Sequence, residues 1–222
     1  MAISDSTAER YTALDPDVRL MLRVQQDDPV AFEELMQRFQ NRVVSLMTHL
    51  VGSRDLAEDL SQDIFLRVYR SRKRYAPGSK FSTWLYTIAH NVALNSRRSL
   101  SRRREVNLVG QESGEFGGNP LDHAALAASG LMPTRQLDKA ELGSVVQIAI
   151  AALGERQRMA VLLNKFEHLG YEEIAEVMEL TPSAVKSLLS RARANLRDVL
   201  EPYLQEGIRV TPIPPSSPGG VS

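Results

Sequence analysis

The 222-residue sequence contains no cysteine and few aromatic residues. Without thiols it cannot form a disulfide scaffold, a thiolate zinc site or a cysteine nucleophile. No apolar run approaches the roughly twenty residues of a membrane-spanning helix. The longest nearly apolar run, 145–153, includes Gln147, and the first ten residues lack the basic start and apolar stretch of a secretory signal. We therefore expect a cytoplasmic protein with no membrane insertion.

Motifs of the common enzyme classes are also missing. The sequence has no GxGxxG, HExxH or GxSxG motif, and Gly78-Ser79-Lys80 lacks the upstream spacing of a P-loop. The four histidines are scattered, and none forms a metal-ligand pair. A recombinase would need a catalytic Ser or Tyr among arginines, whereas the N-terminal helices show only packing periodicity. We expect no enzyme activity, no catalytic residues, no metal, no cofactor and no small-molecule substrate.

The charges are distributed unevenly, although the formal net charge is zero. Residues 67–104 hold eleven Lys and Arg and no Asp or Glu, whereas residues 1–66 hold six basic and twelve acidic groups. Salt screens charges beyond about 8–10 Å, so the acidic residues elsewhere do not cancel this positive field. The basic stretch also contains Tyr, Phe and Trp, on which single-stranded bases stack. The pattern predicts a nucleic-acid surface, with a solvated basic face as the alternative.

Helical spacing of apolar residues, with almost no strand alternation, predicts an all-α protein. Asp15-Pro16 and Asp28-Pro29 are typical helix starts, Gly52 is a typical helix end, and Asp55 with Glu58 suggests a capping box for the next helix. A fourth helix is expected over 81–98.

These helices form a predicted first domain, 15–104, after a flexible N-terminus, 1–14. The Gly- and Pro-containing acidic stretch 105–137 predicts a flexible linker. A second helical domain is expected over 138–204, followed by a disordered Pro-rich tail, 205–222.

The second domain contains a predicted helix-turn-helix. Tyr171–Glu179 is short and amphipathic, and Thr181 can cap a second helix that begins at Pro182. The outer face of that helix is polar and basic, as in helices that enter the DNA major groove. An ordinary helical hairpin with a solvated face is the alternative. The face consists of Ser183, Lys186, Ser187, Ser190 and Arg191.

Three segments together resemble the extracytoplasmic-function (ECF) group of sigma-70 family sigma factors. They are DLAEDLSQDIF from Asp55, FSTWLYTIAHN from Phe81, and LGERQRMAVL from Leu153 followed by the helix-turn-helix. The resemblance covers about 20–104 and 138–200. One departure is Gly154, where the family usually has proline.

The resemblance implies a sigma factor that binds bacterial core RNA polymerase and promoter DNA, both duplex and single-stranded, and that helps melt the −10 element. The first domain resembles sigma region 2 and the second resembles region 4, which binds the −35 element. The linker would then lie in the polymerase's RNA path. An anti-sigma factor is a partner that the resemblance allows.

The expected site residues follow from the resemblance and from side-chain chemistry. Asp59, Gln62 and Asp63 are expected to contact the polymerase clamp. Trp84 could instead belong partly to the core. The expected −10 and single-strand contacts are Lys80, Phe81, Trp84, Tyr86, His90, Asn91, Asn95, Arg97 and Arg98.

Two other functions remain compatible with the sequence. A helix-turn-helix regulator that binds only duplex DNA would explain the second domain, but it leaves the basic aromatic stretch without a purpose. A sigma-like protein that no longer melts promoters would act by interaction alone.

Overall fold

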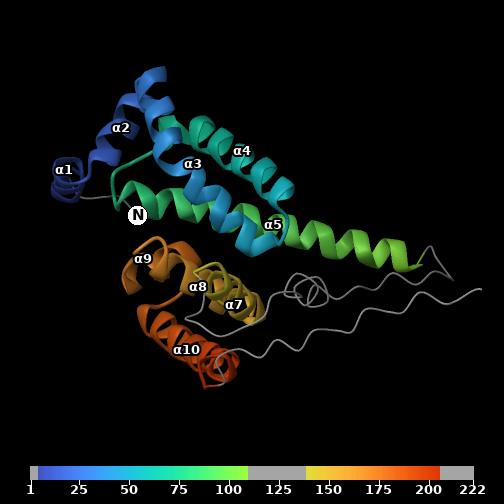
Figure 1. Ribbon diagram of the computed structural model, residues 1–222. Helices are drawn as coiled ribbons and strands as arrows, with labels where there is room; N and C mark the ends of the chain where they lie inside the picture. Colours follow the sequence, from blue (N-terminus) through green and yellow to red (C-terminus); the bar gives the residue numbers. More distant parts are fainter. Residues whose placement is uncertain (1–4, 110–138, 206–222) are drawn as a thin grey trace, which may run out of the picture. The chain divides into compact units, whose positions relative to one another are not determined.

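The computed structural model describes residues 5–109 and 139–205, which form helices and no strands (Figure 1). This confirms the all-α prediction. The described helices pack into two units: residues 5–109 with 155–192, and residues 139–154 with 193–205. The first unit therefore contains helices from both predicted domains, and the predicted domain boundaries stay a prediction.

The N-terminal part of the first unit differs from the prediction at both ends. Residues 5–14 form helix α1 where we expect a flexible segment, and α5 continues to Val109, past Arg98 and into the predicted linker. The rest of the linker and the Pro-rich tail lie outside the described residues. The elements are α1 (Asp5–Leu14), α2 (Pro16–Gln25), α3 (Pro29–Val51), α4 (Arg54–Ser71), the 3-10 turn η1 (Arg72–Arg74) and α5 (Phe81–Val109).

Side-chain caps define where these helices begin. Asp15 accepts a hydrogen bond from the Asp17 N–H at 2.9 Å, and Asp28 accepts from Val30 N–H at 3.0 Å, as their Asp-Pro pairs predict. The capping box predicted for α4 is wrong: Ser53 is the cap residue, and Glu58 pairs instead with Arg54 on the helix surface.

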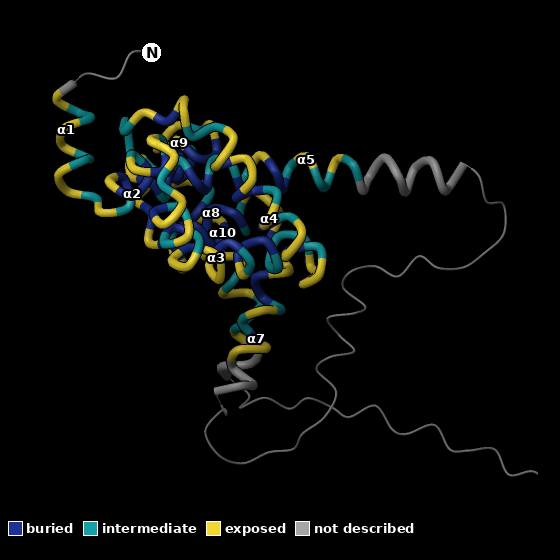
Figure 2. Tube along the Cα trace, turned by 90° about the horizontal axis from the view of Figure 1, so that it is seen from above, coloured by how far each residue is buried: buried dark blue, intermediate teal, exposed yellow. Residues whose placement is uncertain are grey.

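Helices α2 to α5 share one apolar core. Helix α3 packs against α2, α4 and α5, and the buried stretches appear dark blue in Figure 2. Phe39 and Phe81 meet edge to face, with ring centroids 5.2 Å apart. Asp15 Oδ2 also accepts the Phe81 N–H at 3.1 Å, so one carboxylate ties the start of α2 to the start of α5. The core thereby fixes the N-terminal end of α5.

The remaining helices are α7 (Lys139–Ala152), α8 (Glu155–Lys165), α9 (Tyr171–Met178) and α10 (Pro182–Gln205). The turn between α9 and α10 contains Glu179 in a left-handed conformation, φ 54°. Thr181 caps α10 by accepting the Ala184 N–H at 3.2 Å. This pair of helices confirms the predicted helix-turn-helix. None of the described helices combines the length and the apolarity that crossing a membrane requires.

Candidate nucleic-acid interface

One face of α4 is polar and open to solvent. Asp59 and Gln62 are exposed, while Asp63 is partly exposed and pairs with Arg67 at 2.9 Å. Leu66 lies one turn after Gln62 and is 51% exposed, so it adds an apolar side chain to the same face. Leu66 was not anticipated from the sequence because a leucine on a helix is ordinarily assigned to the core. This face has the charge and apolar content of a protein contact.

The residues expected to contact the −10 element divide by exposure. Lys80, Asn91, Asn95 and Arg98 are exposed, and Trp84, His90 and Arg97 are partly exposed. Phe81 and Tyr86 are fully buried, so the expectation that they offer a stacking surface does not fit this structure.

Trp84 packs into an aromatic cluster. Its ring centroid lies 4.9 Å from that of Tyr75 and 6.1 Å from that of Phe81, and both partners are buried. Trp84 is therefore partly a core residue, one of the two alternatives that the sequence leaves open, and it keeps a partly exposed surface.

Tyr86 turns away from this cluster and meets Glu167. The Tyr86 hydroxyl donates a short hydrogen bond to Glu167 Oε2, and Arg42 donates from Nε to the same oxygen at 2.8 Å. The Glu167 side chain is only 6% exposed. Burial, and then the Glu167 charge, raise the pKa of Tyr86, so the phenol stays protonated and keeps donating. We call these three residues the latch.

Around the latch, acidic groups of residues 155–176 contact polar and basic groups near α5. Lys80 Nζ lies 2.9 Å from Glu173 Oε1, Ser79 Oγ lies 3.0 Å from Glu176 Oε1, and Arg97 pairs with Glu155. We call these contacts the rim.

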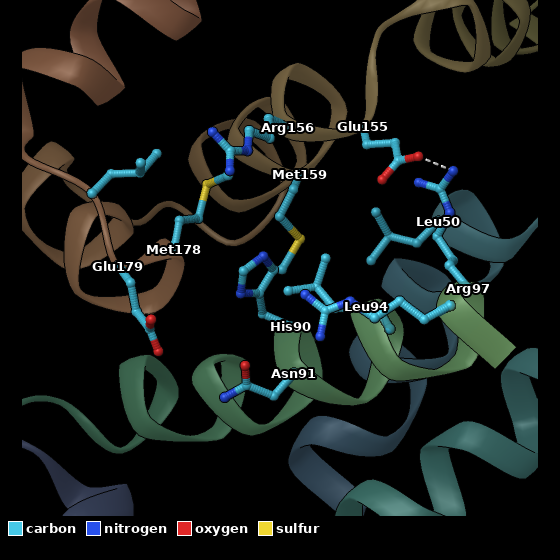
Figure 3. Close-up of a pocket in the computed structure, with 13 residues that line it drawn as sticks. Leu50, His90, Asn91, Leu94, Arg97, Glu155, Arg156, Met159, Met178 and Glu179 are labelled. Carbon is cyan, nitrogen blue, oxygen red and sulfur yellow. Dashed lines mark ion pairs between the residues drawn. The ribbon is translucent and has the colours of Figure 1, made fainter.

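A cavity of about 620 Å³ opens between α5, α8 and α9 (Figure 3). His90 and Asn91 face it from α5, Met159 from α8, and Met178 with Glu179 from the end of α9. Burial lowers the pKa of His90 and favours the neutral imidazole. Among the residues that the structure describes, no group of His, Asp and Glu is arranged to hold a metal ion.

The outer face of α10 is fully open. All five residues predicted to contact DNA are exposed, while Val185, Leu189 and Ala192 are buried on the other side. The exposed set is Ser183, Lys186, Ser187, Ser190 and Arg191.

Glu167 and Arg42 were not anticipated from the sequence. Glu167 stands between Phe166 and His168, and nothing in its neighbourhood indicates a partner 125 positions away. The one local signal is a carboxylate inside an otherwise apolar stretch, which suggests a buried pair without naming the other member.

Comparison with known families supports the resemblance seen in the motifs. Residues 18–103 match the family model for sigma-70 region 2, and residues 145–196 match the model for sigma-70 region 4. The chain belongs to the sigma-70 family. This sigma factor is 34% identical over 192 residues to RNA polymerase sigma-H factor of Pseudomonas aeruginosa, covering 86% of this chain and 97% of the relative.

Relatives of the ECF group match at similar levels. The sigma factor is 33% identical to the ECF sigma-E factor of Haemophilus influenzae, over 85% of this chain and 97% of that protein. It is 34% identical to the ECF sigma-E factor of Escherichia coli K12, over 85% and 96%. These matches confirm the assignment to the ECF group.

Two solved structures share the fold of the sigma factor. CnrH in complex with the cytosolic domain of CnrY gives a TM-score of 0.60 at 20% identity, covering 85% of this chain and 99% of that one. RpoE from Bartonella quintana, solved with the anti-sigma factor NepR, gives 0.57 at 24% identity, covering 77% and 96%.

Proposed function

We propose that this protein binds bacterial core RNA polymerase in the cytoplasm, directs it to specific promoters and helps to melt the −10 element. The observation that carries the proposal is the match to regions 2 and 4 in one chain, together with an exposed polar surface on each. A regulator that binds only duplex DNA would use the α10 face and would have no need of region 2.

Each surface suits one partner. The polymerase clamp would meet Asp59, Gln62 and Asp63 on α4. The major groove of the −35 element would receive α10, whose Lys186 and Arg191 can contact phosphate or guanine. A restraining anti-sigma factor is a further proposed partner.

Melting needs groups that capture an unpaired base, because extruding a base costs a few kcal/mol. Asn91 and Asn95 are exposed one turn apart on α5 and can read base edges, while Arg98 is placed for phosphate. Trp84 keeps a partly exposed ring for stacking. We name Ser79, Lys80, His90, Asn91 and Arg97, with Trp84, Asn95 and Arg98, the −10 surface.

The test combines gel filtration with promoter opening. The protein is mixed with bacterial core polymerase, and permanganate reactivity of unpaired thymines is read on candidate promoters. We expect co-elution and opened DNA, and we expect Asn91→Ala to lose opening while it keeps co-elution. Duplex binding without co-elution would contradict the proposal and leave a duplex-only regulator. Co-elution without opening would support the interaction-only alternative.

A further inference from the structure

We infer that helix α2 positions the loop 76–80, which carries part of the −10 surface, by holding both ends of that loop. Asp15 holds the end of the loop from the start of α2, while Gln25 and Asp27 hold its beginning from the other end of the helix. These three residues lie outside the −10 surface, so they are positioning residues and not DNA contacts. The inference rests on the proposed function only in taking the −10 surface as the DNA contact.

The loop 76–80 begins and ends at buried aromatic residues. Tyr75 precedes it and Phe81 follows it, and these residues are 4% and 0% exposed. Their ring centroids lie 6.5 Å apart, so the loop leaves the core and returns to it at points that are close together. Ala76 and Lys80 within the loop are exposed. The loop therefore projects from a fixed base, and its path depends on how the two ends are held.

The end of the loop is fastened by Asp15, the residue that caps α2. Its carboxylate oxygens have separate partners: Oδ1 accepts the Asp17 N–H at 2.9 Å, and Oδ2 accepts the Phe81 N–H at 3.1 Å. The Phe81 N–H belongs to the first turn of α5, where N–H groups have no partner within the helix. One carboxylate thus contacts the start of two helices and fixes the point at which the loop becomes α5.

The beginning of the loop is fastened from the C-terminal end of α2, which packs against η1. Asp27 accepts hydrogen bonds from Arg72 Nε at 2.8 Å and from Lys73 Nζ at 2.6 Å. Lys73 Nζ also donates to the Gln25 C=O at 2.7 Å. The Gln25 side-chain amide donates to the Tyr75 C=O at 3.1 Å, the last carbonyl before the loop. The residues that lead into the loop are therefore tied to the turn that ends α2.

Asp27 has an uncommon backbone conformation, with φ 66°. Among residues other than glycine, Asp and Asn adopt this left-handed region most readily. Hydrogen bonds from Lys73 and then Arg72 lower the pKa of the Asp27 carboxyl, so it stays ionised at neutral pH. The turn thereby presents a charged acceptor to η1.

Arg72 and Lys73 belong to the basic stretch 67–104, for which the sequence predicts contact with nucleic acid. The structure gives them partners within the protein instead. Arg72 lies over the Tyr69 ring at 4.0 Å from its centroid, and its side chain is only 20% exposed. Part of the basic stretch therefore holds the loop in place.

The contacts from α9 act on a different part of the loop. Glu173 and Glu176 meet the side chains of Lys80 and Ser79, whereas α2 holds backbone groups on both sides of the loop. Hydrogen bonds to the flanking backbone restrict the path of the chain itself. A loop that is ordered before DNA arrives does not lose that conformational freedom on binding, which favours the complex.

The first experiment measures the mobility of the loop. Because the chain has no cysteine, Ala76→Cys provides a unique spin-label site that is exposed. The electron paramagnetic resonance spectrum should show a predominantly immobile label. Asp27→Asn keeps a residue that tolerates the left-handed conformation and removes its charge. It should raise the ratio of mobile to immobile label by about three- to tenfold, as expected for the loss of two exposed ion pairs.

Asp15→Asn tests the other end of the loop. Asparagine caps a helix about as well as aspartate does, but its side chain has one acceptor oxygen and cannot accept from both Asp17 and Phe81. The start of α2 should therefore remain intact while the loop gains a similar mobility. Asp17→Asn is the matched control, because Asp17 pairs with Arg38 at 2.6 Å and joins α2 to α3. It should change the ratio by less than about twofold.

The second experiment measures promoter opening with core polymerase on one promoter and on versions with single base changes in the −10 element. Contacts to the DNA backbone set the register of a protein on its site, so a loosened loop should discriminate less well. We expect Asp15→Asn and Asp27→Asn to lower opening of the best promoter by about three- to tenfold and to reduce its advantage over the altered promoters. A variant that is merely less stable would lower opening equally on all of them.

An immobile label in both Asp15→Asn and Asp27→Asn would overturn the inference. Equal mobility in Asp17→Asn, or opening that falls by the same factor on every promoter, would overturn it as well. If the unaltered chain opens no promoter, the proposed function fails, whereas the mobility of the label still decides whether α2 holds the loop.

Discussion

Gly52 ends α3 in a conformation that side chains rarely adopt. Its φ is 76°, and its N–H donates to Thr48 C=O at 2.9 Å. A Cβ at this position would meet nothing within 4 Å, so the cost of a side chain lies in the backbone alone. We predict that Gly52→Ala lowers the free energy of unfolding by roughly 1–2 kcal/mol, measured by urea denaturation followed by circular dichroism.

Gly143 provides the matched control. It is exposed within α7, and a Cβ there would also meet open space. The same substitution should stabilise the protein by about 0.5–1 kcal/mol, because alanine loses less entropy in a helix than glycine does. Equal effects at the two glycines would refute the argument from backbone conformation.

Single residues also show what sequence could not predict. Tyr86 lies in a basic aromatic stretch and has the composition of a stacking residue, yet it is fully buried. Its hydroxyl bonds to Glu167, 81 positions away, and local spacing carries no information about such a pair. The exposed Asn91 was predictable because its place follows from the helix and the motif alone.

At the scale of one helix, α4 offers a test of the polymerase contact. Asp59 and Glu58 are neighbouring exposed acids, but Glu58 pairs with Arg54 and only Asp59 belongs to the proposed contact face. Asp59→Ala should weaken binding to core polymerase by roughly 1–2 kcal/mol, as for a charged residue near the centre of an interface. The measurement is a titration of labelled core enzyme.

Glu58→Ala is the control and should leave the affinity for core polymerase within about twofold. A charge at the edge of an interface mainly affects association rates. Equal losses in the two variants would indicate a general charge effect and contradict the assignment of a specific face.

The start of α4 shows why element boundaries are harder to predict than elements. Asp55 and Glu58 have the spacing of a capping box, but Ser53 is two residues earlier and also follows Gly52, which has already ended α3. The chain uses the first suitable cap after the break, and the alternatives differ by little free energy. For α2 and α3, the proline that follows Asp15 and Asp28 fixes both the cap and the first helical residue.

For the whole molecule, added salt should weaken the exposed rim pairs more than the buried latch. The rim pairs Lys80–Glu173 and Arg97–Glu155 are partly exposed, and screening shortens from about 10 Å at 0.1 M salt to about 3 Å at 1 M. With spin labels at Gln40→Cys on α3 and Lys165→Cys on α8, both exposed, we predict that the distance distribution from pulsed electron paramagnetic resonance stays narrow across this range when Glu167 is present. The reason is that buried Glu167 is screened much less.

In Glu167→Ala the latch is lost and the exposed rim pairs carry more of the contact between α9 and the start of α5, so the same increase in salt should broaden the distance distribution. A salt-induced broadening with Glu167 in place would show that the exposed rim pairs, and not the latch, hold α8 and α9 against α5.

Glu173 has two separate connections. Its Oε2 accepts the Gly170 N–H at 2.7 Å and starts α9, while its Oε1 meets Lys80. If Lys80 binds a DNA phosphate instead of Glu173, the hydrogen bond from Gly170 to Glu173 can stay intact. The first turn of α9 is then still capped. The hydrogen bond that starts α9 is thus separate from the ion pair with Lys80. A substitution at Lys80 could therefore change the −10 surface without altering how the helix-turn-helix contacts a promoter.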